Sequence, residues 1–220
     1  GTHEAAFPHV YNIAANSVMK LHAKGSGAIE VLADGKSLGT AAVEAAIRPD
    51  TGLLCVQAVN NETGVMQDVE AMAQLARRRG ILYLCDGVQS FAHCQQPLKL
   101  PDFVSLSAHK LGGPTGVGAL IVRQPDRISP FIHGGGQELG YRAGTENTAG
   151  MAGFALAAEL SFAEKYAEKA RLESLSDHFV SALRNLDGRI VLNGKNAPRR
   201  AGILNFSFPD MSGEELVLKL

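Results

Sequence analysis

Short apolar runs that alternate with helical stretches constrain the fold of this chain more than any other feature of its sequence. Runs of strand length occupy residues 53–59, 81–85, 103–107 and 118–123. Between the first two lies a helical stripe at 68–79, with Asp68 as its N-cap and Gly80 as its stop. Runs that are apolar nearly throughout indicate strands buried on both faces, and their alternation with helices predicts an α/β sheet with helices on both sides.

The last two of these runs are joined by a short, turn-rich link. It contains Gly112-Gly113-Pro114-Thr115-Gly116, which leaves no room for a helical crossover. We therefore expect runs 103–107 and 118–123 to pair antiparallel. The predicted sheet is mixed and mostly parallel.

The rest of the chain has weaker patterns that predict further helices and strands. Helices are expected at 5–24 and 37–48, and a strand at 28–32. Residues 148–186 have the pattern of two helices or of one long broken helix. Short strands are expected at 190–192 and 203–208, and Ser212-Gly213-Glu214-Glu215 has the pattern of a capping box that opens a last helix. Because that helix is left with unburied apolar residues, we expect the chain to be a fragment.

This pattern predicts three parts. Residues 1–150 would form a large α/β domain, 151–187 connecting helices, and 188–220 the beginning of a small α+β domain.

Composition excludes several classes of protein. The 21 Lys and Arg residues balance 22 Asp and Glu, so no broad basic face for nucleic acid is expected. No apolar run approaches the roughly 18–20 residues of a membrane span, and the start lacks a secretory pattern. Three cysteines argue against a disulfide framework, and no Cys/His spacing resembles a zinc site. We expect a soluble, cytoplasmic protein that holds no metal and binds neither nucleic acid nor membrane.

Polar side chains follow the ends of the expected strands, where open α/β sheets bind ligands. Asp86 follows one strand, and Lys110 follows another. A lysine can form a Schiff base with an aldehyde cofactor, while a carboxylate can keep a pyridine nitrogen protonated, which is how proteins hold pyridoxal 5′-phosphate. Ser107 and His109 are suited to hold its phosphate. Gln89 and Asn61 would approach the phenolic oxygen of its ring.

Four motifs carry a resemblance to a known family. They are Asn61-Glu62-Thr63-Gly64, Asp86-Gly87-Val88-Gln89, Ser107-Ala108-His109-Lys110 and Arg142-Ala143-Gly144-Thr145. In order and approximate spacing, they resemble the cysteine desulfurases of the NifS/IscS type. These enzymes belong to the class V aminotransferase family and have the type I fold of enzymes that use pyridoxal phosphate (PLP). The segments His3-Glu4-Ala5-Ala6-Phe7 and Leu204-Asn205-Phe206-Ser207-Phe208 are also similar to family segments.

The resemblance implies a role for each matching residue. Lys110 would carry the cofactor and later move protons, and His3 would stack over the ring and act in acid–base steps. Asp86 would pair with the pyridine nitrogen, with Gln89 and Asn61 at the phenolic oxygen. Ser107 and His109 would bind the phosphate. Thr145 would reach the phosphate of a partner subunit's cofactor, which implies a homodimer.

The resemblance also implies an activity, the conversion of L-cysteine to L-alanine. Sulfur would pass to a protein persulfide and on to an acceptor protein, for iron–sulfur cluster assembly or other sulfur metabolism. The family's upstream phosphate loop, its persulfide-forming cysteine and its substrate-binding arginine have no counterpart here, so the chain alone is expected to be inactive. Thr2 stands where the family usually has Glu, and Ala143 replaces a common Ser.

Two other interpretations remain open. The first is another class V enzyme, such as a selenocysteine lyase or a related amino-acid lyase or epimerase, because the cofactor residues do not separate these. The second is a non-catalytic scaffold with the same fold.

Overall fold

The centre of the molecule is a four-stranded mixed sheet. The computed structural model describes residues 18–23, 27–32, 39–130 and 132–220. The sheet contains β3 (Leu53–Gln57), β4 (Leu82–Asp86), β5 (Phe103–Ser107) and β6 (Gly118–Val122), in that spatial order. The first three strands are parallel, and β6 pairs antiparallel with β5. The predicted mixed sheet and its antiparallel pair are confirmed.

Helix α2 (Val69–Arg79) packs against one face of this sheet. Asp68 caps its start by accepting a hydrogen bond from the Ala71 amide at 2.9 Å, and Gly80 ends it in the left-handed conformation with φ of 65°. Both end signals were predicted. The apolar stripe of α2 is buried against alternate residues of β3, β4 and β5, which together form the main core.

The strands are not buried on both faces as predicted. Burial alternates along β3 and β4, so that only every second side chain is fully buried. In β6, Leu120 and Ile121 are 53% and 43% exposed. The prediction failed because an apolar run reports the hydrophobicity of both faces but not which neighbours cover them.

The first described elements correct a second prediction. Residues Val18–Ala23 form strand β1, which pairs antiparallel with β2 (Gly27–Leu32), so the expected helix at 5–24 is wrong for 18–23. Polar Lys20 and His22 alternate with apolar neighbours in this stretch, and a period of two is typical of a strand. Residues 5–17 and 24 lie outside the described part. The expected strand at 28–32 is confirmed, and the helix expected at 37–48 is the shorter α1 (Thr40–Ala46).

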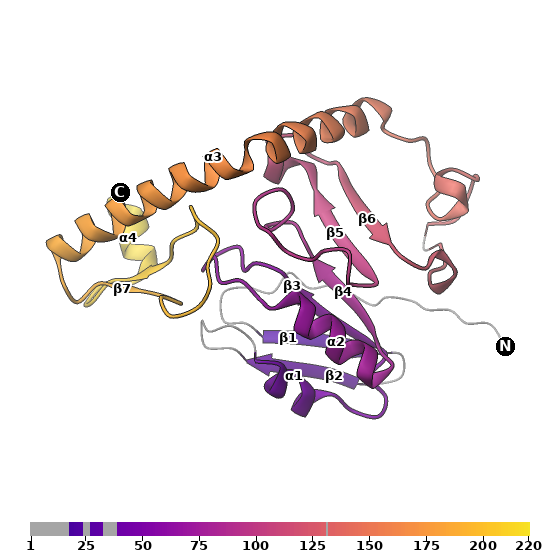
Figure 1. The fold of residues 1–220 in the computed structure, drawn as a ribbon, viewed down its shortest axis with the longest axis horizontal. Helices are drawn as coiled ribbons and strands as arrows, with labels where there is room; N and C mark the ends of the chain where they lie inside the picture. The colour runs from indigo at the N-terminus through magenta and orange to yellow at the C-terminus, as the bar shows by residue number, and fades with distance from the viewer. Residues whose placement is uncertain (1–17, 24–26, 33–38, 131) are drawn as a thin grey trace.

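A single helix, α3 (Thr148–Leu186), runs along the upper edge of the molecule (Figure 1). Its 39 residues are continuous, so neither form expected for 148–186, two helices or one broken helix, is correct. Small residues at one helical face, Gly150, Gly153 and Ala157, lie against the turn that follows β5. A Cβ atom on Gly153 would lie 2.7 Å from Pro114 Cγ, so glycine allows the close approach of helix and turn.

The chain after α3 forms a small unit below its far half (Figure 1). Strands β7 (Val191–Leu192) and β8 (Phe206–Ser207) pair antiparallel and are shorter than the predicted 190–192 and 203–208. Helix α4 (Gly213–Lys219) follows, with the Ser212 hydroxyl accepting from the Glu215 amide at 3.1 Å. The predicted cap is thus present. The domain division at 150 and 187 stays a prediction.

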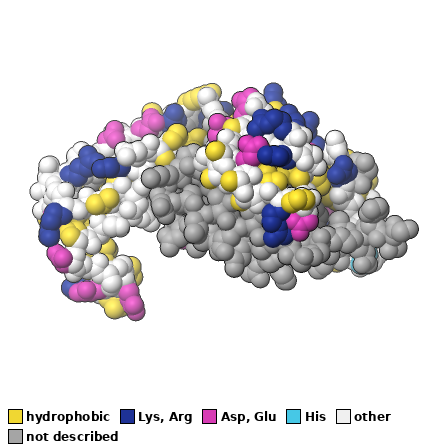
Figure 2. Space-filling view, turned by 90° about the horizontal axis from the view of Figure 1, so that it is seen from below, with side chains coloured by type: hydrophobic (Ala, Val, Ile, Leu, Met, Phe, Trp, Pro, Cys, Tyr) yellow, Lys and Arg dark blue, Asp and Glu magenta, His cyan; other side chains and the backbone are white. Residues whose placement is uncertain are grey.

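Positive and negative side chains are mixed on the surface of the second half of α3 and of the small unit that follows it. Figure 2 shows Lys and Arg side chains interspersed with Asp and Glu on its left-hand side. Pairs such as Arg171–Glu168 at 2.7 Å and Lys169–Glu173 at 3.6 Å lie one helical turn apart on α3. The described part of the chain also contains short 3-10 segments: η1 (Ala108–Leu111), η2 (Pro125–Arg127) and η3 (Glu138–Gly140). Within the described ranges, no helix has the length and apolar character needed to cross a membrane.

Candidate functional site

Most of the residues predicted to bind the cofactor lie at one edge of the sheet, which we call the ligand edge. Strands β3, β4 and β5 are parallel, so their carboxyl ends meet at the same edge. Asn61 follows β3, Asp86 ends β4 and Ser107 ends β5. The turn η1 directly after β5 carries His109 and Lys110. The sheet therefore brings together the groups that the sequence placed after separate strands.

Asp86 is a half-buried carboxylate with no cationic partner among the described residues. Its Oδ1 accepts a hydrogen bond from the Val88 amide at 3.0 Å. Burial raises the pKa of this carboxyl, while hydrogen bonds from the Val88 amide and the Ser105 side chain act to lower it. A protonated ring nitrogen beside Asp86 would compensate the cost of burying its charge. The carboxylate thus fits a ligand that carries such a group.

Ser107 and His109 form a pair, with 2.7 Å between Ser107 Oγ and His109 Nδ1. If the hydroxyl donates to Nδ1, the imidazole Nε2–H remains as a donor. If Nδ1–H donates instead, the hydroxyl hydrogen remains. Either arrangement leaves one donor for an anionic oxygen, which is what a phosphate requires.

Lys110 is exposed, and no described carboxylate lies within ion-pair distance of its ammonium group. Its carbonyl oxygen accepts a hydrogen bond from His93 Nε2 at 2.9 Å, which ties η1 to the turn after β4. The backbone of Lys110 is therefore held while its amine stays unpaired in the described part. Such an amine can react with an aldehyde once it loses its proton.

Asn61 and Gln89 lie on two turns that flank this edge. Asn61 is exposed, on a turn closed by Asn60 Oδ1, which accepts from the Thr63 amide at 2.8 Å. Gln89 is half-buried, and its Oε1 accepts a hydrogen bond from Arg200 Nη1. Sequence reasoning missed Arg200. The sequence signal that could have found it is the pair Arg199-Arg200, which has no acidic residue nearby in the sequence.

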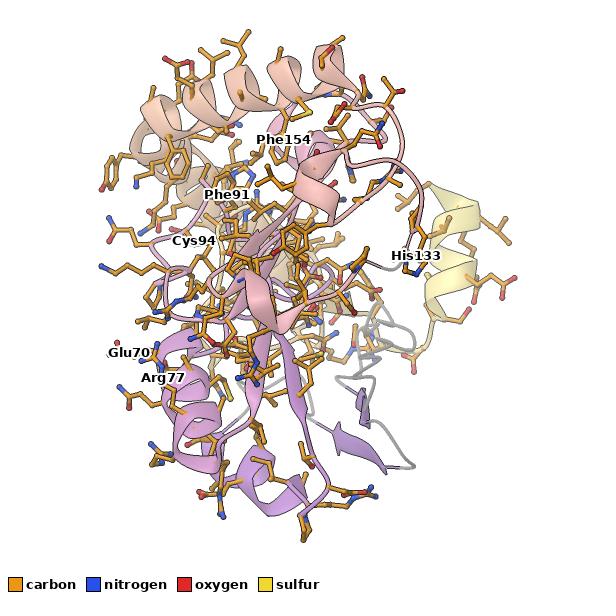
Figure 3. All side chains as sticks on the ribbon, turned by 90° about the vertical axis from the view of Figure 1, so that its right-hand side faces the viewer. Glu70, Arg77, Phe91, Cys94, His133 and Phe154 are labelled. Carbon is orange, nitrogen blue, oxygen red and sulfur yellow. The ribbon has the colours of Figure 1, made fainter. Side chains whose placement is uncertain are left out.

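Thr145 and His3 are not joined to this group. Thr145 is exposed in the loop before α3, and no hydrogen bond links it to Lys110, Ser107 or His109 in the part of the chain that is described. His3 lies outside the described residues. His133 is exposed on a loop that lies apart from Phe91 and Cys94 (Figure 3).

A cavity of about 480 Å³ opens beside Lys110. Its walls come from the turn around His93 and Cys94, from η1, from α3 and from Arg199 and Arg200. Asp86, Ser107 and His109 do not line it. The cavity and the ligand edge therefore share Lys110 but are different surfaces of the molecule.

The three thiols are poorly placed for reaction. Burial raises the pKa of Cys55 and of Cys85 to about 12. Burial also raises the pKa of the half-buried Cys94, and the positive charges of Arg200 and Lys169 partly offset this increase. A raised pKa depletes the reactive thiolate. No group of metal-ligating side chains occurs among the described residues.

Comparison with known proteins shows which family the chain resembles. The family model for class-V aminotransferases matches residues 9–220. The chain is 38% identical over 179 residues to a protein named cysteine desulfurase IscS from Dictyoglomus turgidum, covering 80% of the chain and 45% of the relative. It is 42% identical over 185 residues to a protein of the same name from Pseudomonas putida, covering 82% and 45%.

A solved structure gives the same result. The NifS-like protein from Rickettsia africae superimposes with a TM-score of 0.77 at 26% identity, covering 84% of the chain and 52% of that protein. The chain spans about half the length of the curated relatives it matches. The match over residues 9–220 and the shared fold show that this chain belongs to the class-V aminotransferase family.

Proposed function

We propose that the chain binds pyridoxal 5′-phosphate through Lys110 and forms part of a cysteine desulfurase. The observation that carries the proposal is the arrangement of Asp86, Ser107 and Lys110 at the carboxyl edge of three parallel strands. An unpaired amine, a half-buried carboxylate and a pair of donors for a phosphate are the groups that this cofactor needs. The names of the relatives support the choice of cysteine as substrate.

Each residue has a proposed part in holding the cofactor. Lys110 would bind it covalently and move protons, and Asp86 would face the ring nitrogen. Ser107 and His109 would donate to the phosphate. Asn61 and Gln89 would face the phenolic oxygen, and His3 the ring itself. Thr145 would serve a second copy of the chain in a homodimer.

When bound, the cofactor would withdraw electrons from the substrate and weaken its carbon–sulfur bond. The chain's residues would orient it and exclude water from Asp86. The proposed products are L-alanine and a sulfur atom carried by a protein thiol to an acceptor protein. A related lyase acting on selenocysteine would use the same cofactor residues.

Trapping the bound cofactor tests the proposal. The chain is incubated with PLP, reduced with borohydride, digested and mapped by mass spectrometry. We expect the label on Lys110, and we expect the Lys110→Ala variant to lose it. Lys165→Ala is the matched control, because Lys165 lines the same cavity without following a strand. A label that stays on another lysine would contradict the proposal.

A further inference from the structure

Backbone pairing brings the segment around Arg200 to the ligand edge. The Met66 amide donates to the Pro198 carbonyl and the Arg200 amide to the Gly64 carbonyl, each at 2.8 Å. Val65 and Arg199 form an antiparallel bridge between these hydrogen bonds. A segment that follows α3 is thereby fixed beside the turn that follows β3. The position of Arg200 is set by its backbone and not by its side chain alone.

The Arg200 guanidinium is half-buried and has no carboxylate within ion-pair distance in the described part of the chain. Burial lowers the pKa of this group. Its Nη1 donates to Gln89 Oε1. A partly desolvated cation usually has an acidic partner. The hydrogen bond from Arg200 to the neutral amide of Gln89 therefore calls for an explanation.

The chemistry of the two groups fixes the orientation of the Gln89 amide. A guanidinium has five donors and no acceptor, so it can face only the oxygen of an amide. The Gln89 Nε2 group is then left as a donor, and the hydrogen bonds of the described residues assign it no partner. A glutamine free to rotate would offer either end of its amide to a ligand.

We propose that Arg200 is a positioning residue that holds the Gln89 amide so that its Nε2 donor faces the phenolic oxygen of the cofactor. This inference rests on the proposed function, because it assumes that the cofactor lies at this edge. Arg200 would not touch the cofactor itself. It would act through Gln89, and its charge would favour negative charge on the phenolic oxygen.

The effect has a definite sign. A hydrogen-bond donor and a positive charge near the phenolic oxygen both favour the deprotonated form of the lysine–cofactor linkage. Removing Arg200 should therefore raise the pH at which the absorption band of the bound cofactor changes. A merely structural role for Arg200 would lower the melting temperature and leave this pH unchanged.

The experiment compares five variants of the chain loaded with PLP. Arg200→Leu is expected to raise the spectral midpoint by about 0.5–1 pH unit and to weaken PLP binding roughly fivefold. Arg200→Lys keeps the charge and one donor site, so it should lie between Arg200→Leu and the wild type. Arg199→Leu is the matched control, because Arg199 donates to the carbonyls of Asn193 and Ile203 and not to Gln89. It should leave the midpoint where it is.

The fourth variant combines Arg200→Leu with Gln89→Leu and is compared with the fifth, Gln89→Leu alone. If Arg200 acts mainly through Gln89, Arg200→Leu should shift the midpoint clearly less in the Gln89→Leu background than in the wild type, and the remaining shift reports the direct effect of its charge. Additive shifts, or an equal shift in Arg199→Leu, would overturn the inference while the cofactor still binds. A wild-type chain that traps no PLP at Lys110 would instead refute the proposed function, and the inference with it.

Discussion

At the scale of single residues, Asp86 and Asp102 make different contributions. Asp102 Oδ2 accepts from the Tyr83 amide at 2.9 Å, so its carboxylate supports β4, whereas Asp86 faces the ligand edge. Asp86→Asn removes the charge that would pair with the ring nitrogen and should weaken PLP binding about 10- to 100-fold. Asp102→Asn should lower the melting temperature without changing PLP affinity. Titration with PLP followed by absorbance measures both, and equal losses of affinity would contradict the role of Asp86.

The buried thiols predict a loss of stability in alkali. In the unfolded chain, Cys55 and Cys85 have the ordinary thiol pKa of 9.0. In the folded chain, burial raises the pKa of each to about 12. Above pH 9 the unfolded chain therefore loses protons that the folded chain keeps. The free energy of unfolding should fall by up to about 1.4 kcal/mol per pH unit for each thiol. Urea unfolding at pH 8, 9 and 10 measures the slope.

Cys85→Ala supplies the control for this prediction. It removes one of the two thiols and should make the slope above pH 9 shallower. A slope that does not change would show that other groups cause the alkaline loss.

How far single residues could be predicted depended on their distance in sequence from their partners. Asp86, Ser107 and Lys110 could be placed together because each lies at or shortly after the end of a strand, and parallel strands share an edge. Arg200 could not be linked to Gln89, since 111 residues separate them and no local pattern reports the contact. Side chains that act across such distances become visible only in the folded chain.

At the scale of elements, the pairing of 64–66 with 198–200 depends on Gly64. Gly64 has φ of 73°, and a Cβ atom there would lie 2.8 Å from the Ile203 carbonyl oxygen. Gly64→Ala should destabilise the fold by about 1 kcal/mol for its backbone conformation and by a further 1–3 kcal/mol or so for the clash. Chemical unfolding measures the total.

Gly80→Ala is the matched control for this change. Gly80 has a similar φ of 65°, but nothing lies within 4 Å of the added Cβ. It should show only the backbone cost. If both variants lose the same stability, the contact between Gly64 and Ile203 does not hold the two segments together.

Elements with signals in their own sequence were predicted well. Strand β5 was predicted with its observed bounds, and α2 with both of its ends, because apolar runs and caps act within a few residues. The strand at Val18–Ala23 was predicted as helix, although its alternation was visible. Here the tertiary pairing with β2 decided the conformation.

At the scale of the whole molecule, the chain by itself should not produce alanine or sulfide from L-cysteine with PLP present. The reaction needs a thiolate near the substrate, and burial raises the pKa of all three thiols. For Cys55 and Cys85, whose pKa is about 12, only about one thiol in ten thousand is ionised at pH 8. An assay for alanine and sulfide measures this directly.

Cysteine variants give the control for this assay. A chain with all three cysteines replaced by alanine should behave like the wild type. Turnover that is lost in Cys94→Ala would show that Cys94 is the nucleophile. Turnover that survives the loss of all three cysteines would favour a lyase that needs no protein thiol.

Helix α3 has a mechanical consequence. It rises 1.5 Å per residue, so its 39 residues span about 58 Å. One half rests on the turn beside Lys110 through Gly150, Gly153 and Ala157. The other half holds β8 through an edge-to-face contact between the rings of Phe179 and Phe206, whose centroids are 5.9 Å apart. Because a long helix bends little, a tilt at one end of α3 is transmitted to its other end. A tilt of about 5° at the end beside Lys110 would carry the far end by several ångströms, so a small adjustment beside the lysine becomes a large displacement at the other end of the helix.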